Sequence, residues 1–232
     1  MVEDIIKKVK EKTDTIILSF SCGKESIVMW LILGDHFRII PLYLYIIPGL
    51  GFVEESLKYY EGFFCNKIYQ RPSQLLINML RNCIFSAPSQ FRGYSGLRLR
   101  GDYYGIIDDL KEELGIGDAY IANGMRANEN LFQRLNLRKT GPIKRERKIF
   151  YPMHDWTNTD VEREIKKANI RLPIDYKLFG RSFNGIGYRF LKPIRERFPE
   201  DYKLILDWFP LAELEIKRME YRDEHFRQAR SE

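Results

Sequence analysis

Apolar runs of strand length alternate with helical patterns through the first two-thirds of the chain. An apolar, β-branched run from Thr15 to Phe20 predicts a buried strand, and the pattern from Ile27 to Leu33 predicts a helix directly after it. The same reasoning predicts further strands at 38–47, 67–70 and 118–123, and helices at 53–64, 74–81, 102–114 and 159–168. Ser73 is the expected N-cap of the helix at 74–81, and an irregular segment is expected at 84–100. This order favours a doubly wound α/β fold, in which helices cover both faces of a mainly parallel sheet.

The two ends of the chain favour helices. The first eight residues form a short amphipathic pattern, and two further helices are expected at 201–209 and 211–228. Beyond Pro173 the chain is rich in aromatic and basic residues. We therefore expect an α/β domain over residues 1–176 and a helical C-terminal extension over residues 177–232, packed on that domain.

Composition favours a folded protein that does not act at a membrane. Of the 232 residues, 44% are hydrophobic and 14% aromatic, which is enough to build a core. No segment approaches the ~20 uninterrupted apolar residues of a membrane span. The N-terminus lacks the apolar core of a signal peptide, so a cytoplasmic location is expected. Cys22, Cys65 and Cys83 have no metal-ligand spacing, and neither a metal site nor an iron–sulfur cluster is expected.

The net charge of +6 is unevenly distributed. Three basic clusters stand out: Arg92, Arg98 and Arg100; Arg138, Lys139, Lys144, Arg145, Arg147 and Lys148; and Arg181, Arg189, Lys192, Arg195 and Arg197. Such clusters serve polyphosphate, nucleic acid or a protein partner, or they form a solvated face. The sequence also leaves open whether the protein forms a homodimer.

The turn between the first predicted strand and helix is the strongest functional signal. Small residues between Ser21 and Ser26 leave backbone N–H groups aimed at one point, at the positive end of the helix dipole. Lys24 adds a mobile cation, and the two serines add hydroxyl groups. The spacing is neither that of a Walker loop nor that of a dinucleotide-binding loop. It predicts a phosphate-binding turn, and an ordinary strand–turn–helix is the alternative.

A second polar turn follows the strand predicted at 118–123. Because the carboxyl ends of parallel strands meet at one edge of a sheet, the segment from Gly124 to Arg134 is expected beside the first turn. The planar guanidinium of Arg126 suits phosphate, so it is a candidate for the far end of a nucleotide. A capped helix start with surface polar residues is the alternative.

These segments together resemble a known family. Ser21-x-Gly23-Lys24-Glu25-Ser26 resembles the pyrophosphate (PP) loop of the adenine nucleotide α-hydrolase-like superfamily. With it, Gly124-Met125-Arg126 and the block Tyr151-Pro152-x-x-Asp155-Trp156-Thr157-x-x-Asp160-Val161 resemble, in order, segments of the phosphoadenosine phosphosulfate reductase family. The resemblance covers about residues 15–176 and implies a Rossmann-like fold.

The resemblance also implies a ligand and a set of site residues. The ligand is ATP, or the sulfonucleotides PAPS or APS, with Mg²⁺. Lys24 and Arg126 are the implied catalytic residues. The implied nucleotide-binding residues are Ser19, Phe20, Ser21, Cys22, Gly23, Lys24, Glu25, Ser26, Ile47, Gly49, Gly124, Arg126 and Arg134.

Three departures from the family pattern change the expected activity. Glu25 stands where the family usually has Asp, and Ile47-Pro48-Gly49 stands where it has Asp-Thr-Gly. The chain has no cysteine after Cys83, whereas the reductases need a thiolate near the C-terminus as nucleophile. Sulfonucleotide reduction is therefore not expected.

Three functions remain open. The first is an enzyme that cleaves ATP between its α- and β-phosphates, adenylylating an acceptor that the sequence does not identify. The second is a nucleotide-binding accessory module with little chemistry of its own, or a sulfonucleotide-binding protein. The third is a nucleic-acid binder or modifier, with the Arg138–Lys148 cluster contacting phosphates.

Overall fold

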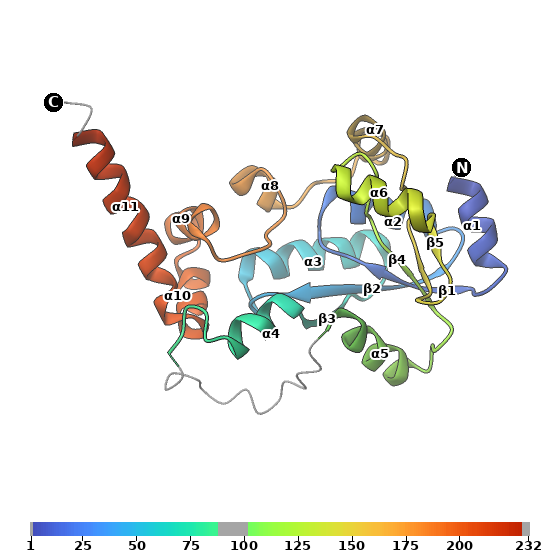
Figure 1. The fold of residues 1–232 in the computed structure, drawn as a ribbon, viewed down its shortest axis with the longest axis horizontal. Helices are drawn as coiled ribbons and strands as arrows, with labels where there is room; N and C mark the ends of the chain where they lie inside the picture. Colours follow the sequence, from blue (N-terminus) through green and yellow to red (C-terminus); the bar gives the residue numbers. More distant parts are fainter. Residues whose placement is uncertain (1, 88–101, 229–232) are drawn as a thin grey trace. The chain divides into compact units, whose positions relative to one another are not determined.

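The computed structural model describes residues 2–87 and 102–228 (Figure 1). These residues fall into two compact units, and the boundary passes through two helices and near the ends of two strands. The first unit takes its described residues from 2–44, 59–71 and 104–173. The second takes them from 45–58, 72–87, 102–103 and 174–228. The division expected at residue 176 stays a prediction.

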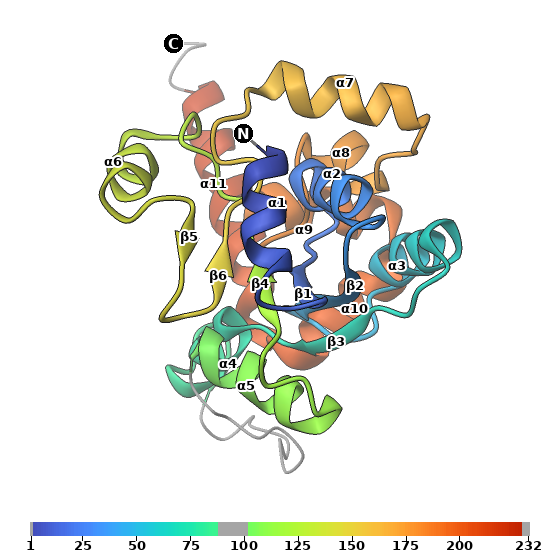
Figure 2. The ribbon, with the colours of Figure 1, turned by 90° about the vertical axis from the view of Figure 1, so that its right-hand side faces the viewer.

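A six-stranded sheet forms the centre of the first unit, apart from the last residues of β2 and β3 (Figure 2). Its order is β3-β2-β1-β4-β6-β5; β2, β1, β4 and β6 run parallel, and β5 pairs antiparallel with β6. The predicted, mainly parallel α/β sheet is thus confirmed. The strands are β1 Thr15–Ser19, β2 Arg38–Tyr45, β3 Tyr69–Pro72, β4 Tyr120–Ala122, β5 Ile143–Lys144 and β6 Ile149–Phe150.

Helices cover both faces of this sheet. Figure 2 shows α1, α2 and α7 on one face and α5 on the other. The helices of this unit are α1 Val2–Lys10, α2 Lys24–Leu33, α5 Tyr103–Leu114, α6 Leu131–Thr140 and α7 Asn158–Ala168, together with the C-terminal part of α3 Gly51–Phe64. Tyr103, the first residue of α5, is assigned to the second unit.

The core of the first unit follows from its apolar pattern. In β1, Ile16, Ile17 and Leu18 are fully buried on both faces, as expected for a central parallel strand. α2 is apolar nearly all round because it lies between the sheet and α7. The Trp30 ring of α2 stacks on Phe64 with centroids 4.1 Å apart.

The second unit is helical and has an aromatic core of its own. Phe52 packs edge-on against Phe179 and Phe183, with centroids 6.2 and 5.5 Å away. As predicted, Ser73 caps a helix: its hydroxyl accepts the Leu76 N–H at 3.1 Å. The unit's helices are α4 Gln74–Arg81, α8 Ile174–Phe179, α9 Tyr188–Arg197, α10 Pro199–Trp208, the 3₁₀ turn η2 Pro210–Ala212 and α11 Glu213–Gln228.

Several predicted boundaries move by a few residues, and three helices went unpredicted. The helix predicted from 27 begins at Lys24, and the one predicted from 211 begins at Glu213, after η2. No helix was predicted at α6, α8 or α9, and α9 has Pro193 in its interior. Most of the irregular segment expected at 84–100, including Arg92, Arg98 and Arg100, lies outside the described residues. Within the part that the structure describes, no helix is long and apolar enough to span a bilayer.

A carboxylate of α10 holds the first turn of α3, within the second unit. Asp201, 7% exposed, accepts hydrogen bonds from the backbone N–H groups of Gly51 and Phe52 at 2.6 and 3.2 Å. Glycine at 51 permits this approach, because a Cβ there would lie 3.3 Å from Asp201 Oδ1. The carboxylate therefore satisfies two amides that a helix start leaves without partners.

Replacing Asp201 with alanine should lower the free energy of unfolding by about 1.5–3 kcal/mol, because two amides lose a charged acceptor. Asp207→Ala removes a carboxylate from an exposed position of the same helix and should change it by less than about 0.5 kcal/mol. Urea denaturation followed by circular dichroism measures both. Equal losses in the two variants would contradict the capping role.

Candidate functional site

The turn after β1 is a tight connection into α2. The N–H of Phe20 donates to Leu42 O at 2.9 Å, which ends the strand pairing, and the chain then reverses at Cys22 with φ +56°. Few residues other than glycine adopt this left-handed conformation, and it marks a turn whose shape the surrounding structure enforces. Gly23 is the N-cap of α2, and no side-chain oxygen caps this helix.

Two serine hydroxyls organise the turn. Ser26, 2% exposed, donates its hydroxyl to Gly23 O at 2.9 Å and accepts the Ser21 N–H at 3.2 Å. The Ser21 hydroxyl lies 3.4 Å from Ser26 Oγ and accepts the Gly23 N–H at 3.3 Å. These bonds fix the loop backbone, so the amides that open α2 are held in place before any ligand arrives.

Lys24 forms a loose ion pair on the outside of the turn. Its Nζ lies 3.4 Å from Oε1 of Glu162 on α7, and the two side chains are 24% and 53% exposed. Ion pairs of this exposure contribute about 0–1 kcal/mol. The pair with Glu162 therefore opposes the transfer of Lys24 to a multiply charged anion only weakly.

Arg126 is held much more firmly, in a buried cluster. Its Nη2 donates to Glu25 Oε1 at 2.7 Å and to Asn158 Oδ1 at 2.9 Å. Its Nε lies 3.6 Å from Glu129 Oε1 and has no hydrogen-bond acceptor among the described residues. Arg126 is 4% exposed, and its guanidinium binds Glu25, the acidic residue of the loop. Its predicted contact with a nucleotide stays a prediction.

Gly124 makes the approach of the two turns possible. A Cβ at this position would lie 3.1 Å from Glu25 Cβ and 3.3 Å from Met29 Cε. The backbone after β4 therefore packs directly on the first turns of α2. This confirms the expectation that the turns after β1 and β4 share one edge of the sheet.

α7 contributes two residues to the site, Asn158 and Glu162, that the sequence analysis missed. Thr157 and Asp160 form the capping box that starts α7, and the hydrogen bonds from the Thr157 hydroxyl and amide lower the pKa of Asp160. One turn apart on the helix that follows, Asn158 binds Arg126 and Glu162 pairs with Lys24. Their i, i+4 spacing, with Asn158 directly after the N-cap Thr157, was the available signal.

The other predicted site residues lie in varied surroundings. Ser19 ends β1, and the buried ring of Phe20 packs edge-on to Trp30, with centroids 5.1 Å apart. Arg134 is exposed on α6. Ile47 and Gly49 belong to the second unit; Ile47 is 2% exposed, and Gly49 has φ +77°. Their roles in nucleotide binding stay predictions.

Among residues 2–87 and 102–228, no group of three or more His, Cys, Asp or Glu could hold a metal ion. No family model matches the chain, and no curated protein matches it.

Several solved structures are similar to this one. An NH3-dependent NAD synthetase from Campylobacter jejuni has 10% sequence identity and a TM-score of 0.46, with 94% of this chain and 92% of that chain covered. A phosphoadenylyl-sulfate reductase from Candida auris has 10% identity and a TM-score of 0.49, with 79% and 93% covered. A U34-tRNA thiolase from Methanococcus maripaludis has 11% identity and a TM-score of 0.45, with 91% and 80% covered.

Gly124→Ala should destabilise the protein by about 1–3 kcal/mol, since its methyl group overpacks the contact with α2. Gly117→Ala is the matched control, because a Cβ there would meet nothing within 4 Å. Chemical denaturation measures both. Equal stability of the two variants would contradict the close approach.

Glu25→Gln should lower the free energy of unfolding by about 3 kcal/mol, because it leaves the buried guanidinium of Arg126 without its nearest counter-charge. Glu162→Gln makes the same chemical change in the exposed pair with Lys24 and should cost less than about 1 kcal/mol. Thermal and urea unfolding at low salt compare the two. A Glu162 variant as unstable as the Glu25 variant would refute this ranking.

Proposed function

We propose that the loop of residues 21–26 binds the phosphates of an adenine nucleotide and that the protein cleaves ATP between the α- and β-phosphates. The observation that supports this most is the turn itself. A left-handed residue, Cys22, leads into a helix without a side-chain cap, and a serine network fixes the backbone in between. Helix starts of this kind bind phosphate through their backbone N–H groups.

Lys24 supplies the mobile charge in this proposal. Its exposed pair with Glu162 exchanges for the phosphates, whose charge is larger and whose oxygens accept several hydrogen bonds. The buried pair of Glu25 and Arg126 stays in place and positions the loop. Because Glu25 neutralises Arg126, Lys24 and the loop amides supply the positive potential for the phosphates in this proposal.

The proposed reaction is a displacement at the α-phosphorus. A nucleophile on the acceptor forms a bond to the α-phosphorus, and the bond from this phosphorus to the bridging oxygen breaks. The electron pair leaves with pyrophosphate, and the loop amides and Lys24 balance the charge that develops there. Mg²⁺ would arrive bound to the nucleotide, since its preferred ligands are phosphate oxygens and waters with few carboxylates.

A second candidate is a nucleotide-binding module without turnover. The specific observation in its favour is that Glu25 and Asn158 already occupy Nη2 of Arg126, one of the two implied catalytic groups. Pyrophosphate release separates the two functions. The enzyme releases pyrophosphate from ATP when candidate acceptors are added, and the module binds ATP without releasing it.

Calorimetric titration with ATP, APS and PAPS, with and without Mg²⁺, tests the nucleotide site. Lys24→Ala should weaken binding of the preferred nucleotide by about 10- to 100-fold, the loss expected for a charge-assisted contact. Lys8→Ala removes an exposed lysine from α1 and should leave binding unchanged. If Lys24→Ala binds every nucleotide as tightly as the wild-type protein, the loop is not the site.

A further inference from the structure

The positive charge of the chain is concentrated in one segment of 18 residues. Residues 131–148 contain seven of the 38 Lys and Arg residues and one of the 32 Asp and Glu residues. This segment therefore carries a net charge of +6, and the remainder of the chain balances to zero. It forms α6 and the β5–β6 hairpin, all within the first unit.

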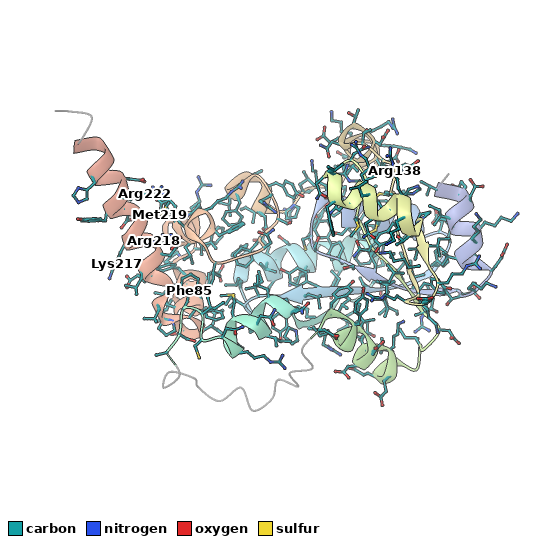
Figure 3. All side chains as sticks on the ribbon, in the orientation of Figure 1. Phe85, Arg138, Lys217, Arg218, Met219 and Arg222 are labelled. Carbon is teal, nitrogen blue, oxygen red and sulfur yellow. The ribbon has the colours of Figure 1, made fainter. Side chains whose placement is uncertain are left out.

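Most of these cations are presented to solvent rather than used inside the fold. Arg134, Arg138, Lys139 and Arg145 are exposed, and within the described ranges no ion pair or side-chain hydrogen bond holds them. Figure 3 shows Arg138 on α6. By contrast, Arg147 donates to the Tyr104 hydroxyl at 2.8 Å and Lys148 pairs with Asp118 at 2.8 Å. Four cations thus remain for a ligand.

Large apolar side chains lie among these cations. Leu131, Phe132 and Leu135 of α6 are 67%, 79% and 54% exposed, while Leu137 alone among the leucines of this helix is buried. Phe132 is an aromatic ring with most of its surface in water, and Lys139, seven positions further on, falls on the same face of the helix. Exposed apolar groups gathered in one place mark interaction surfaces more often than chance.

The charge pattern indicates which kind of partner this surface can bind. A second copy of this face would bring like charges together, which disfavours a symmetric contact through α6. A cleft of about 560 Å³ next to it is lined by Thr140, Ile143, Lys144, Arg145, Glu146 and Arg147, so Glu146 is its only acid. Exposed cations and an exposed aromatic ring in one segment suit a chain of phosphates whose bases are free to stack.

We propose that α6 and the β5–β6 hairpin bind an unpaired stretch of nucleic acid. Phosphates contact Arg134, Arg138, Lys139 and Arg145, and one base stacks on Phe132. This inference does not depend on the proposed reaction. It places the nucleic acid on the segment that follows Arg126 in the chain.

Fluorescence anisotropy with a fluorescein-labelled 12-nucleotide single strand tests the surface. The logarithm of the binding constant should fall linearly with the logarithm of salt concentration, with a slope of about −3 for four phosphate contacts. The double variant Arg138→Gln/Lys139→Gln should bind at least about tenfold more weakly and reduce the steepness by about 1.4. Lys7→Gln/Lys8→Gln removes the same charge from α1 and should change neither value.

Phe132 tests the stacking part independently of charge. Phe132→Ala should weaken binding of the single strand by about fivefold or more, and Phe132→Tyr should restore it, because both rings offer a flat face. A duplex of the same length should bind more weakly than the single strand and should not respond to Phe132→Ala. Because Phe132 is 79% exposed, loss of folding is not expected in either variant.

Three results would overturn the proposal: no saturable binding at low salt, equal losses in the α6 and α1 double variants, or a duplex preferred over the single strand. The calorimetric titration with ATP separates this outcome from the proposed reaction. The α6 variants should bind ATP like the wild-type protein, whereas Lys24→Ala should keep its affinity for the oligonucleotide.

Discussion

The ion pair between Glu25 and Arg126 joins the two turns on which the candidate site depends. One partner belongs to the first turn of α2 and the other to the connection after β4, 101 positions later. Burying a guanidinium costs free energy unless a counter-charge and hydrogen bonds accompany it, and Glu25 and Asn158 supply both. The pair therefore imposes one arrangement of the two turns. Gly124 is the steric condition for that arrangement, because a side chain there would push the turns apart.

The two cations at this edge have different physical roles because their burial differs. The Lys24 side chain is 24% exposed and has a solvated partner, whereas the Arg126 side chain is 5% exposed. Water reaches the carboxylate of Glu162 more than the guanidinium of Arg126, so the first pair exchanges partners more easily than the second. α7 binds to both cations, through Asn158 and Glu162, and thereby couples the loop to the helix packed over α2. Phosphate binding at Lys24 would release Glu162 and leave the buried cluster unchanged.

Sequence patterns predicted the features that depend on local periodicity. They did not predict the features that depend on contacts between residues far apart in the chain. The strand at Thr15, the Ser73 cap and the shared edge of the two turns follow from alternation, capping chemistry and the rule for parallel sheets. The pairing of Arg126 with Glu25 could not be predicted in this way, since no periodicity relates residues 25 and 126. β5 and β6 have two residues each, too few to show alternation. α9 was not predicted because it contains Pro193, and proline disfavours helix interiors. Packing of the helix can offset the hydrogen bond that proline loses.

The crossover from β4 to β6 explains why charge could accumulate in one segment. These strands are neighbours in the sheet, and 123–148 connects them through Arg126, α6 and β5. Along α6 the fold requires one buried side chain, Leu137, and the other positions are free of core packing. A helix anchored so lightly tolerates exposed leucines, a phenylalanine and several arginines without loss of the core. The same connection delivers Arg126 to the loop and a basic face to solvent, so a ligand on that face would contact the segment that also carries the buried partner of Glu25.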